Sequence, residues 1–186
     1  MKAMVFAAGL GTRLRPLTND RPKALVEVGG KTMLERVITH LADCGVTDIT
    51  VNIHHFGEKI IEFLEEKKNF GLDIHISDER DLLLDTGGGL MKARKFLDGD
   101  EPFIVHNADI LTDLDLKAMY DFHVEHDALS TILVKDRQTQ RYFLFDHDHR
   151  LKGWINKKTG ETKPEGYQYD PQKGSSSTSS RLTEMW

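Results

Sequence analysis

The segment of this sequence best suited to chemistry is rich in glycine and in cations and lies near the N-terminus. Residues 7–25 read AAGLGTRLRPLTNDRPKAL and follow a short apolar run. Gly9 and Gly11 let the backbone turn sharply and bring N–H groups close to a ligand. Four cations lie around this turn: Arg13, Arg15, Arg21 and Lys23. Arg and Lys side chains pair well with phosphate oxygens, so the segment predicts a phosphate-binding loop. A glycine turn beside a solvated basic loop is the alternative.

Two common phosphate-binding patterns do not fit this loop. A Walker A loop needs G-x-x-x-x-G-K-[ST], which is absent here. A dinucleotide-binding loop needs G-x-G-x-x-G, and Leu14 stands in place of its third glycine. The pattern therefore disfavours a flavodoxin-like or dehydrogenase-like domain.

A second glycine-rich segment, D-T-G-G-G-L, covers residues 85–90. Consecutive glycines at the start of a helix cost stability unless the backbone must approach another group closely. Thr86, Gly87 and Gly88 are therefore candidates for contact with a ligand. The alternative is a plain helix start capped by Asp85 or Thr86.

A candidate metal ligand follows an apolar stretch at residues 104–111, which read IVHNADIL. A carboxylate at the end of a buried strand is well placed for a hard cation, because such cations prefer oxygen ligands. Asp109 is that carboxylate, and Asn107 lies beside it. The alternative is that Asn107 and Asp109 only cap the following turn.

Strand-like and helix-like patterns alternate from Lys2 to His126. The order β-α-β-α predicts an α/β fold with a Rossmann-like, mostly parallel sheet and helices on both faces. Ligands in such folds bind beyond the carboxyl ends of the strands, where the loops after Ala8, Asn52, Ser77 and Asn107 begin. Strands are expected at 2–8, 48–53, 73–77 and 102–106, and helices at 31–44, 57–68, 86–97 and 114–126.

The pattern changes after Ala128. Residues 129–134, 141–145 and 151–155 predict strands without helices between them, so an antiparallel addition near the C-terminus is expected. Residues 174–180 read GSSSTSS, a flexible composition that cannot build a core. We predict one main domain at 1–165, incomplete at its C-terminal side, and an atypical Ser-rich tail at 166–186.

Composition excludes several classes of protein. A formal net charge of −5 argues against a nucleic-acid binder that neutralises phosphates over a broad surface. One cysteine, Cys44, leaves no disulfide framework and is expected to be a buried apolar residue at a helix end. Neither a leader nor a bilayer-spanning run is evident, so no membrane partner and a cytoplasmic location are expected. The histidines, His147 and His149 among them, are not accompanied by cysteines or a clear set of ligands, so we do not expect a zinc site.

The motifs together resemble a known family. G-L-G-T-R-L-R-P-L-T followed by P-K-A-L is similar to the pyrophosphorylase motif of sugar-1-phosphate nucleotidyltransferases, G-x-G-T-R-(x)n-P-K. The resemblance implies an enzyme that uses Mg²⁺ to join a nucleoside triphosphate to a sugar 1-phosphate, giving an NDP-sugar and pyrophosphate. It is strongest to members that act on N-acetylmuramate 1-phosphate with UTP or on mannose 1-phosphate with GTP. The choice between UTP and GTP stays open.

The resemblance also implies roles for individual residues. Arg13 and Lys23 would be catalytic: Arg13 would hold the leaving pyrophosphate, and Lys23 would steady the reacting phosphate. Asp109 would bind Mg²⁺, and Asn107 would face the sugar phosphate. Asn52 and His54 are candidates to shape the nucleoside pocket because of their position after the second strand, not because of the resemblance. The implied nucleotide-binding set is Ala7, Ala8, Gly9, Gly11, Thr12, Arg13, Lys23, Thr86, Gly87 and Gly88.

Two features of the family are missing near the C-terminus. Members continue with a strand bearing an aromatic-Ser-Gly-Ile segment and then a second metal-binding aspartate, whereas here Lys173 runs into the serine tract. A non-catalytic nucleotide-binding module, or a weakly active transferase, is therefore the alternative function. A missing strand also leaves an exposed sheet edge, which favours self-association as a homo-oligomer or reduced stability.

Overall fold

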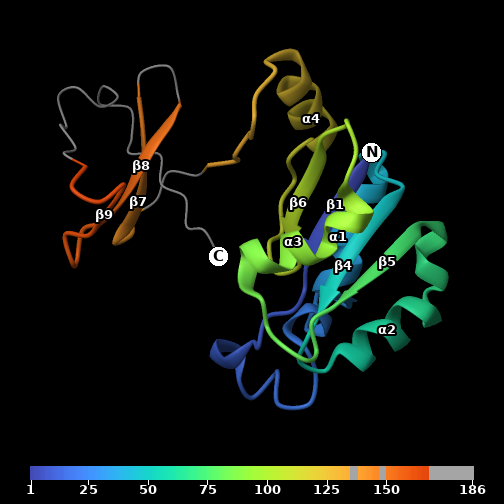
Figure 1. Cartoon of the computed structure of the whole chain (residues 1–186). Helices are drawn as coiled ribbons and strands as arrows, with labels where there is room; N and C mark the ends of the chain where they lie inside the picture. Colours follow the sequence, from blue (N-terminus) through green and yellow to red (C-terminus); the bar gives the residue numbers. More distant parts are fainter. Residues whose placement is uncertain (135–137, 147–149, 168–186) are drawn as a thin grey trace. The chain divides into compact units, whose positions relative to one another are not determined.

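A computed structural model of the chain describes residues 1–134, 138–146 and 150–167 (Figure 1). The chain divides into two compact units, Met1–Ala128 and Leu129–Trp186. The boundary falls where the sequence pattern changes from alternating strands and helices to strands alone. The predicted serine tract at 174–180 and the residues His147 and His149 lie outside the described residues.

A four-stranded parallel sheet forms the centre of the first unit, in the order β5-β4-β1-β6. The strands are β1 (Lys2–Phe6), β4 (Asp48–Ile53), β5 (Asp73–Asp78) and β6 (Phe103–Asn107). Phe6 is in register with Asn52 on one side and with Asn107 on the other. The carboxyl ends of all four strands therefore lie along one edge of the sheet.

Helix α1 shows how the local sequence defines an element. It spans Met33–Asp43, and the Thr32 hydroxyl accepts a hydrogen bond of 3.1 Å from the Glu35 amide at its start. This is half of the T-x-x-E capping pattern, which satisfies an N–H group that the helix itself cannot pair. Gly45, with φ of +87°, lies just beyond its end. The predicted inner face of α1 is buried: Leu34, Val37, Ile38 and Leu41.

Three further helices follow in the first unit: α2 (Gly57–Glu66), α3 (Asp85–Leu97) and α4 (Leu116–Glu125). Short elements complete it: the 3-10 turns η1 (Thr12–Leu14), η2 (Lys23–Leu25) and η3 (Lys68–Gly71), and the hairpin strands β2 (Glu27–Val28) and β3 (Lys31–Thr32). None of the described helices has the length and apolar character that a bilayer crossing requires.

Helices cover both faces of the sheet, as predicted (Figure 1). Residues alternate along β1, so that Ala3 and Val5 join the apolar cluster under α1 and α2. Met4 faces the other way and packs with Ala93 and Leu97 of α3. The chain moves from β1 outward to β4 and β5, and α3 then carries it back to β6 on the far side of β1. This reversal of direction places the expected ligand crevice beyond the carboxyl end of β1.

The second unit has an antiparallel sheet of its own. Strands β7 (Arg141–Phe145), β8 (Leu151–Asn156) and β9 (Thr162–Lys163) pair in that order. This confirms antiparallel strands near the C-terminus. The predicted strand at 129–134 is wrong, because these residues form no ladder and Leu129 is fully exposed. A strand needs a neighbour for its backbone groups, and no strand ladder among the described residues includes this stretch.

Candidate functional site

The glycine loop leaves the central strand β1 at Ala7 and turns at Gly11. Gly11 has φ of +65°, a conformation that side chains with a Cβ adopt at a cost. An added Cβ there would also lie 3.0 Å from Thr18 Cγ2 and 3.2 Å from Lys23 Cβ. The Gly11 carbonyl accepts hydrogen bonds from the Thr18 hydroxyl at 2.8 Å and from the Leu14 amide at 3.0 Å. The turn is therefore fixed on both sides, and only glycine fits it without strain.

The backbone donors of this loop fall into two groups. The Ala7 and Ala8 amides point inward, and both donate to Asn52 Oδ1, at 2.7 and 3.3 Å. Among the described residues, no acceptor pairs with the amides of Gly9, Leu10 or Gly11. These three consecutive N–H groups are the donors that a bound anion would use. Ala7 and Ala8, which are buried, instead anchor the start of the loop.

Lys23 and Asp109 form an ion pair between the end of the glycine loop and the end of β6. Their side chains are 26% and 22% exposed, so the pair is reached by solvent but largely enclosed. Asp109 thus pairs with a cation rather than capping the turn that follows β6. The charge of Lys23 is thus balanced by Asp109 in this structure, while the loop that ends at Lys23 also carries the three amide donors.

Asp109 also bears on whether the site suits Mg²⁺. This ion is commonly held by one or two carboxylates, with waters and substrate phosphates as its other ligands. Asp109 supplies one such carboxylate at the carboxyl edge of the sheet, so the residues fit a metal shared with a phosphate ligand. No group of three or more His, Cys, Asp or Glu side chains within the described residues forms a site by itself.

The second glycine segment forms the first turn of α3, as predicted. No side chain caps this end of the helix, so the alternative in which Asp85 or Thr86 serves as the cap is wrong. Thr86 and Gly87 are exposed and Gly88 is half-buried, which leaves the helix start open to a ligand. Gly89 has a packing role instead: a Cβ there would lie 2.7 Å from Glu79 Oε1 and 3.2 Å from Asn52 Nδ2.

Glu79 is the residue at this edge that sequence reasoning missed. It follows β5, and its carboxylate is completely buried. Oε1 accepts a hydrogen bond of 2.8 Å from Asn52 Nδ2, and Oε2 accepts one of 3.2 Å from the Leu84 amide. The signal for it was its position, directly after a predicted strand whose loop was expected to reach the site.

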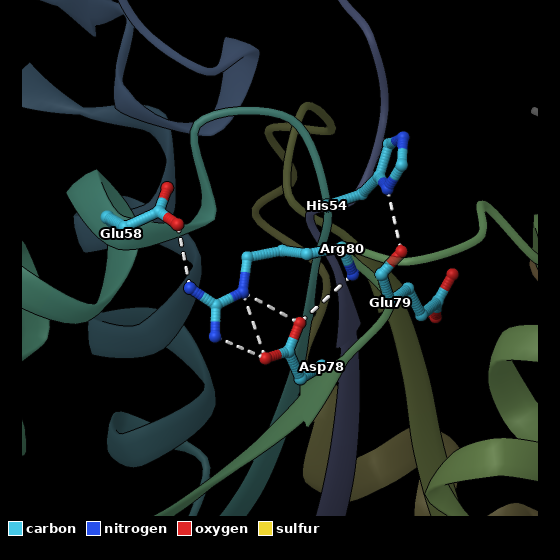
Figure 2. Close-up of polar contacts among 5 residues, drawn as sticks. All are labelled: His54, Glu58, Asp78, Glu79 and Arg80. Atoms are coloured by element: carbon cyan, nitrogen blue, oxygen red, sulfur yellow. Dashed lines mark hydrogen bonds and ion pairs between the residues drawn. The ribbon is translucent and has the colours of Figure 1, made fainter.

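Arg80, Asp78 and Glu58 form an exposed cluster, which lies on the side of the backbone away from the Glu79 carboxylate (Figure 2). The Arg80 guanidinium contacts both oxygens of Asp78 from Nε at 2.9 Å and Glu58 Oε1 from Nη1 at 2.7 Å. Hydrogen bonds from Arg80 lower the pKa of Asp78, and the same ion pairs raise the pKa of Arg80. His54 Nδ1 donates to the Glu79 carbonyl at 2.7 Å. The cluster joins Arg80 to Asp78 and to Glu58 of α2, whereas His54 binds the Glu79 backbone itself.

The remaining predicted residues lie on η1 and at the end of β6. Arg13 and Thr12 are exposed on η1. Asn107 ends β6, half-buried and in register with Phe6. A separate cavity of about 280 Å³ lies against α1 and includes none of the predicted site residues. His106 lines it, and burial lowers the pKa of this histidine. The structure thus brings the glycine loop, Lys23 and Asp109 of the candidate site together at the strand ends, and it leaves the start of α3 exposed.

The chain is similar to known proteins over most of its length. The sequence model of the nucleotidyl transferase family matches residues 2–158. The chain is 49% identical over 109 residues to an N-acetylmuramate alpha-1-phosphate uridylyltransferase of Caulobacter vibrioides, which covers 58% of this chain and 45% of that protein. It is 36% identical over 160 residues to a mannose-1-phosphate guanyltransferase of Candida albicans, which covers 84% and 44%. The chain thus spans about half the length of these relatives.

Solved structures show the same fold. HddC from Yersinia pseudotuberculosis, complexed with GMP-PN, superposes with a TM-score of 0.67 at 27% identity, over 84% of this chain and 69% of that one. A UDP-glucose pyrophosphorylase complexed with UDP-glucose superposes with a TM-score of 0.67 at 18% identity, over 84% and 68%. At that identity the second likeness concerns the fold alone.

Proposed function

This chain belongs to the nucleotidyl transferase family, and from that premise we propose that it carries the nucleotide-binding part of a sugar-1-phosphate nucleotidyltransferase. Such an enzyme joins a nucleoside triphosphate to a sugar 1-phosphate and releases pyrophosphate. The names of the relatives, a uridylyltransferase and guanyltransferases, support UTP or GTP as the nucleotide. Because the chain covers about half of those proteins, the substrates and activity of the whole enzyme are part of the proposal.

One observation carries this proposal. The backbone amides of Gly9, Leu10 and Gly11, which have no acceptor among the described residues, lie in the same loop whose other end brings Lys23 to Asp109. Consecutive amides and a lysine are the groups that bind a polyphosphate, and they lie beyond the carboxyl end of the central strand. Arg13 extends the positive charge along the loop.

The reaction needs positioning and charge neutralisation more than covalent chemistry from the protein. An oxygen of the sugar phosphate attacks the α-phosphorus in line, and the bond between that phosphorus and the bridging oxygen breaks as pyrophosphate leaves. The loop amides would hold the β- and γ-phosphates, and Arg13 would neutralise the departing pyrophosphate. Lys23 would steady the charge that develops at the α-phosphate, a role that preorganised cations fill well in a partly enclosed site.

A metal fits this scheme through one residue. Asp109 would hold Mg²⁺, which supplies charge neutralisation of the triphosphate when it is bound. Lys23, which contacts the same carboxylate, would then turn toward the phosphates. Asn107, at the end of the same strand, would bind the sugar phosphate. Thr86, Gly87 and Gly88 would lie against the nucleoside.

A nucleotide-binding module without turnover is the second candidate. It is favoured because Asp109 is the one carboxylate proposed for the metal, and the described residues include no group of three or more His, Cys, Asp or Glu side chains that could hold an ion. The two functions differ in a direct measurement. A transferase releases pyrophosphate when it receives UTP or GTP with N-acetylmuramate 1-phosphate or mannose 1-phosphate, whereas a binding module shows saturable binding and no release.

The test is therefore calorimetric titration with UTP and GTP, each with and without Mg²⁺, followed by a pyrophosphate-release assay. Binding that strengthens with Mg²⁺ supports the loop and Asp109. Lys23→Ala is expected to lower the rate or the affinity about a hundredfold, because it removes the cation nearest the reacting phosphate. Lys158→Ala, an exposed lysine in the second unit, is the matched control and is expected to change neither. If Lys23→Ala behaves like Lys158→Ala, the proposed role of Lys23 is wrong.

A further inference from the structure

Glu79 is a fully buried carboxylate for which the proposed reaction has no use. Burying a carboxylate is costly, and the cost is offset only where hydrogen bonds satisfy it. The geometry here satisfies every polar group of the residue. Its two side-chain oxygens accept from Asn52 and from the Leu84 amide, its own amide donates to the Ile53 carbonyl at 2.8 Å, and its carbonyl accepts from the Leu82 amide at 3.1 Å and from His54.

Asn52 connects Glu79 to the glycine loop by hydrogen bonds. Its Nδ2 group donates to Glu79, which fixes the orientation of the amide and turns Oδ1 toward β1. Oδ1 then receives the N–H groups of both Ala7 and Ala8. Asn52 is 2% exposed, so water does not compete for these hydrogen bonds. Three segments far apart in sequence are thereby joined by two side chains.

The third segment is the glycine-rich start of α3. The Leu84 amide, just before this helix, binds Glu79 Oε2. Gly89, one turn into the helix, leaves the space that the Glu79 carboxylate occupies, since a Cβ there would lie 2.7 Å from Oε1. A single carboxylate thus sets the positions of both glycine-rich segments of the site.

We propose that Glu79, acting through Asn52, is a positioning residue that fixes the outgoing direction of the glycine loop and holds the start of α3 beside it. The inference rests on the proposed function of that loop as the phosphate-binding element. Neither side chain touches the nucleotide in this scheme. Both act by directing the Ala7 and Ala8 amides inward, so that the next three amides face the ligand.

The hydrogen-bond pattern can be tested by exchanging the carboxylate of Glu79 and the side-chain amide of Asn52 between the two positions. Glu79→Gln leaves one oxygen to serve two donors, so either Asn52 or Leu84 loses its partner. Asn52→Asp places two carboxylate oxygens against each other. In the double variant N52D/E79Q, the carboxylate introduced at position 52 would accept from the loop amides and from the new side-chain NH₂ group at position 79. The remaining amide oxygen at position 79 would accept from Leu84. The net charge of the pair stays the same as in the native chain.

Nucleotide affinity, measured with UTP and GTP, is the first measurement. Each single variant is expected to bind at least about tenfold more weakly, because a buried polar group loses its partner. The double variant is expected to recover to within about threefold of the native chain, as coupled neighbours do. Glu58→Gln, which also replaces a carboxylate by an amide but at an exposed position, is the control and is expected to bind normally.

The amide NMR signals of Ala7 and Ala8 provide a measurement that does not depend on nucleotide. Their hydrogen exchange is expected to accelerate in both single variants and to slow again in the double variant. If the single variants do not fold, the double variant decides: a folded double variant with native affinity supports the proposal. One that stays unfolded, or that folds without binding, overturns it.

A purely structural role gives a different result. The single variants would then unfold more easily while their folded fraction bound nucleotide with native affinity, and this outcome would also overturn the proposal. Failure of the proposed function is separate from both, because it would appear as no binding of UTP or GTP by the native chain. In that case the Ala7 and Ala8 exchange rates still test the hydrogen-bond arrangement.

Discussion

Between the sheet and helices α1 and α2 the space is filled by apolar side chains, whereas under α3 apolar side chains share it with Asn52 and Glu79. The first face buries Ile38 and Val51 completely. The α3 face buries the apolar residues Met4, Ala93 and Leu97 as well as the polar pair. Apolar packing stabilises a fold but is not directional, whereas satisfied buried hydrogen bonds fix how particular groups are oriented. We therefore expect the face under α1 and α2 mainly to stabilise the fold, and the face under α3 mainly to position the candidate site.

The largest expected effect tests the apolar face. Ile38→Ala removes a completely buried side chain from the cluster under α1 and is expected to lower the free energy of unfolding by roughly 2–5 kcal/mol. Chemical denaturation followed by circular dichroism measures this loss. The nucleotide affinity of the folded fraction is expected to stay unchanged. A large loss of affinity would show that this face also positions the site and would remove the contrast between the two faces.

A glycine substitution tests the other face. Gly89→Ala brings a Cβ to 2.7 Å from Glu79 Oε1, and such crowding is expected to cost about 1–3 kcal/mol of unfolding free energy. It is also expected to weaken nucleotide binding, because the Glu79 carboxylate must move.

Gly87→Ala is the matched control for the change in unfolding free energy alone, since a Cβ at Gly87 meets nothing within 4 Å but this residue is proposed to lie against the nucleoside. In that open position alanine favours the helix and is expected to raise the unfolding free energy by about 0.4–1 kcal/mol. Equal effects of the two alanine substitutions would contradict the packing role of Gly89.

The stability of the chain is expected to depend on pH through His106, which lies on β6. Burial lowers the pKa of His106, His40 lowers it further, and a hydrogen bond to the Asn107 carbonyl and the charge of Asp109 oppose these effects. The unfolded chain therefore binds this proton more readily than the folded chain does, so stability rises with pH. Stability is expected to fall as the pH drops below about 6.5, the usual value for histidine.

His106→Gln is expected to flatten this slope between about pH 5 and 7, which lies above the range where carboxylates titrate. Denaturation midpoints measured at half-unit intervals provide the comparison with the native chain. The same slope in both proteins would mean that other histidines cause the dependence.

The smallest effect is expected at the exposed cluster. Arg80→Ala removes the contacts with Asp78 and Glu58, but solvent screens charges at the surface and such pairs contribute little. We expect a small fall in the denaturation midpoint that disappears at high salt. A loss as large as that of Gly89→Ala would show that the surface cluster, and not only the buried pair, holds Glu79 in place.

Local signals in the sequence were sufficient for most of the first unit. The helical spacing of apolar residues over 31–44 predicted α1, and the structure confirms it. The glycines of the loop predicted a sharp turn, which Gly11 makes. Helix and strand periods are local properties, so a single sequence reveals them.

Features that depend on distant partners were not predictable. Burial of Glu79 requires Asn52, which lies 27 residues earlier, and nothing in the local pattern indicates that pair. The strand expected at 129–134 has suitable residues but no described neighbour with which to pair. The ligand roles of Arg13, Lys23, Asn107 and Asp109 stay predictions, although the Lys23–Asp109 ion pair shows that two of these residues meet.

The central place of β1 has a consequence for motion. Because β4 and β6 both pair with it, the β1 amides are expected to exchange with solvent only when the whole first unit unfolds. The amides of Gly9, Leu10 and Gly11, only a few residues farther along, have no such protection among the described residues and are expected to exchange within the native state. The slowest and the fastest exchange are thus expected on either side of Ala7 and Ala8, so the loop can open and close around a ligand without loosening the sheet that carries it.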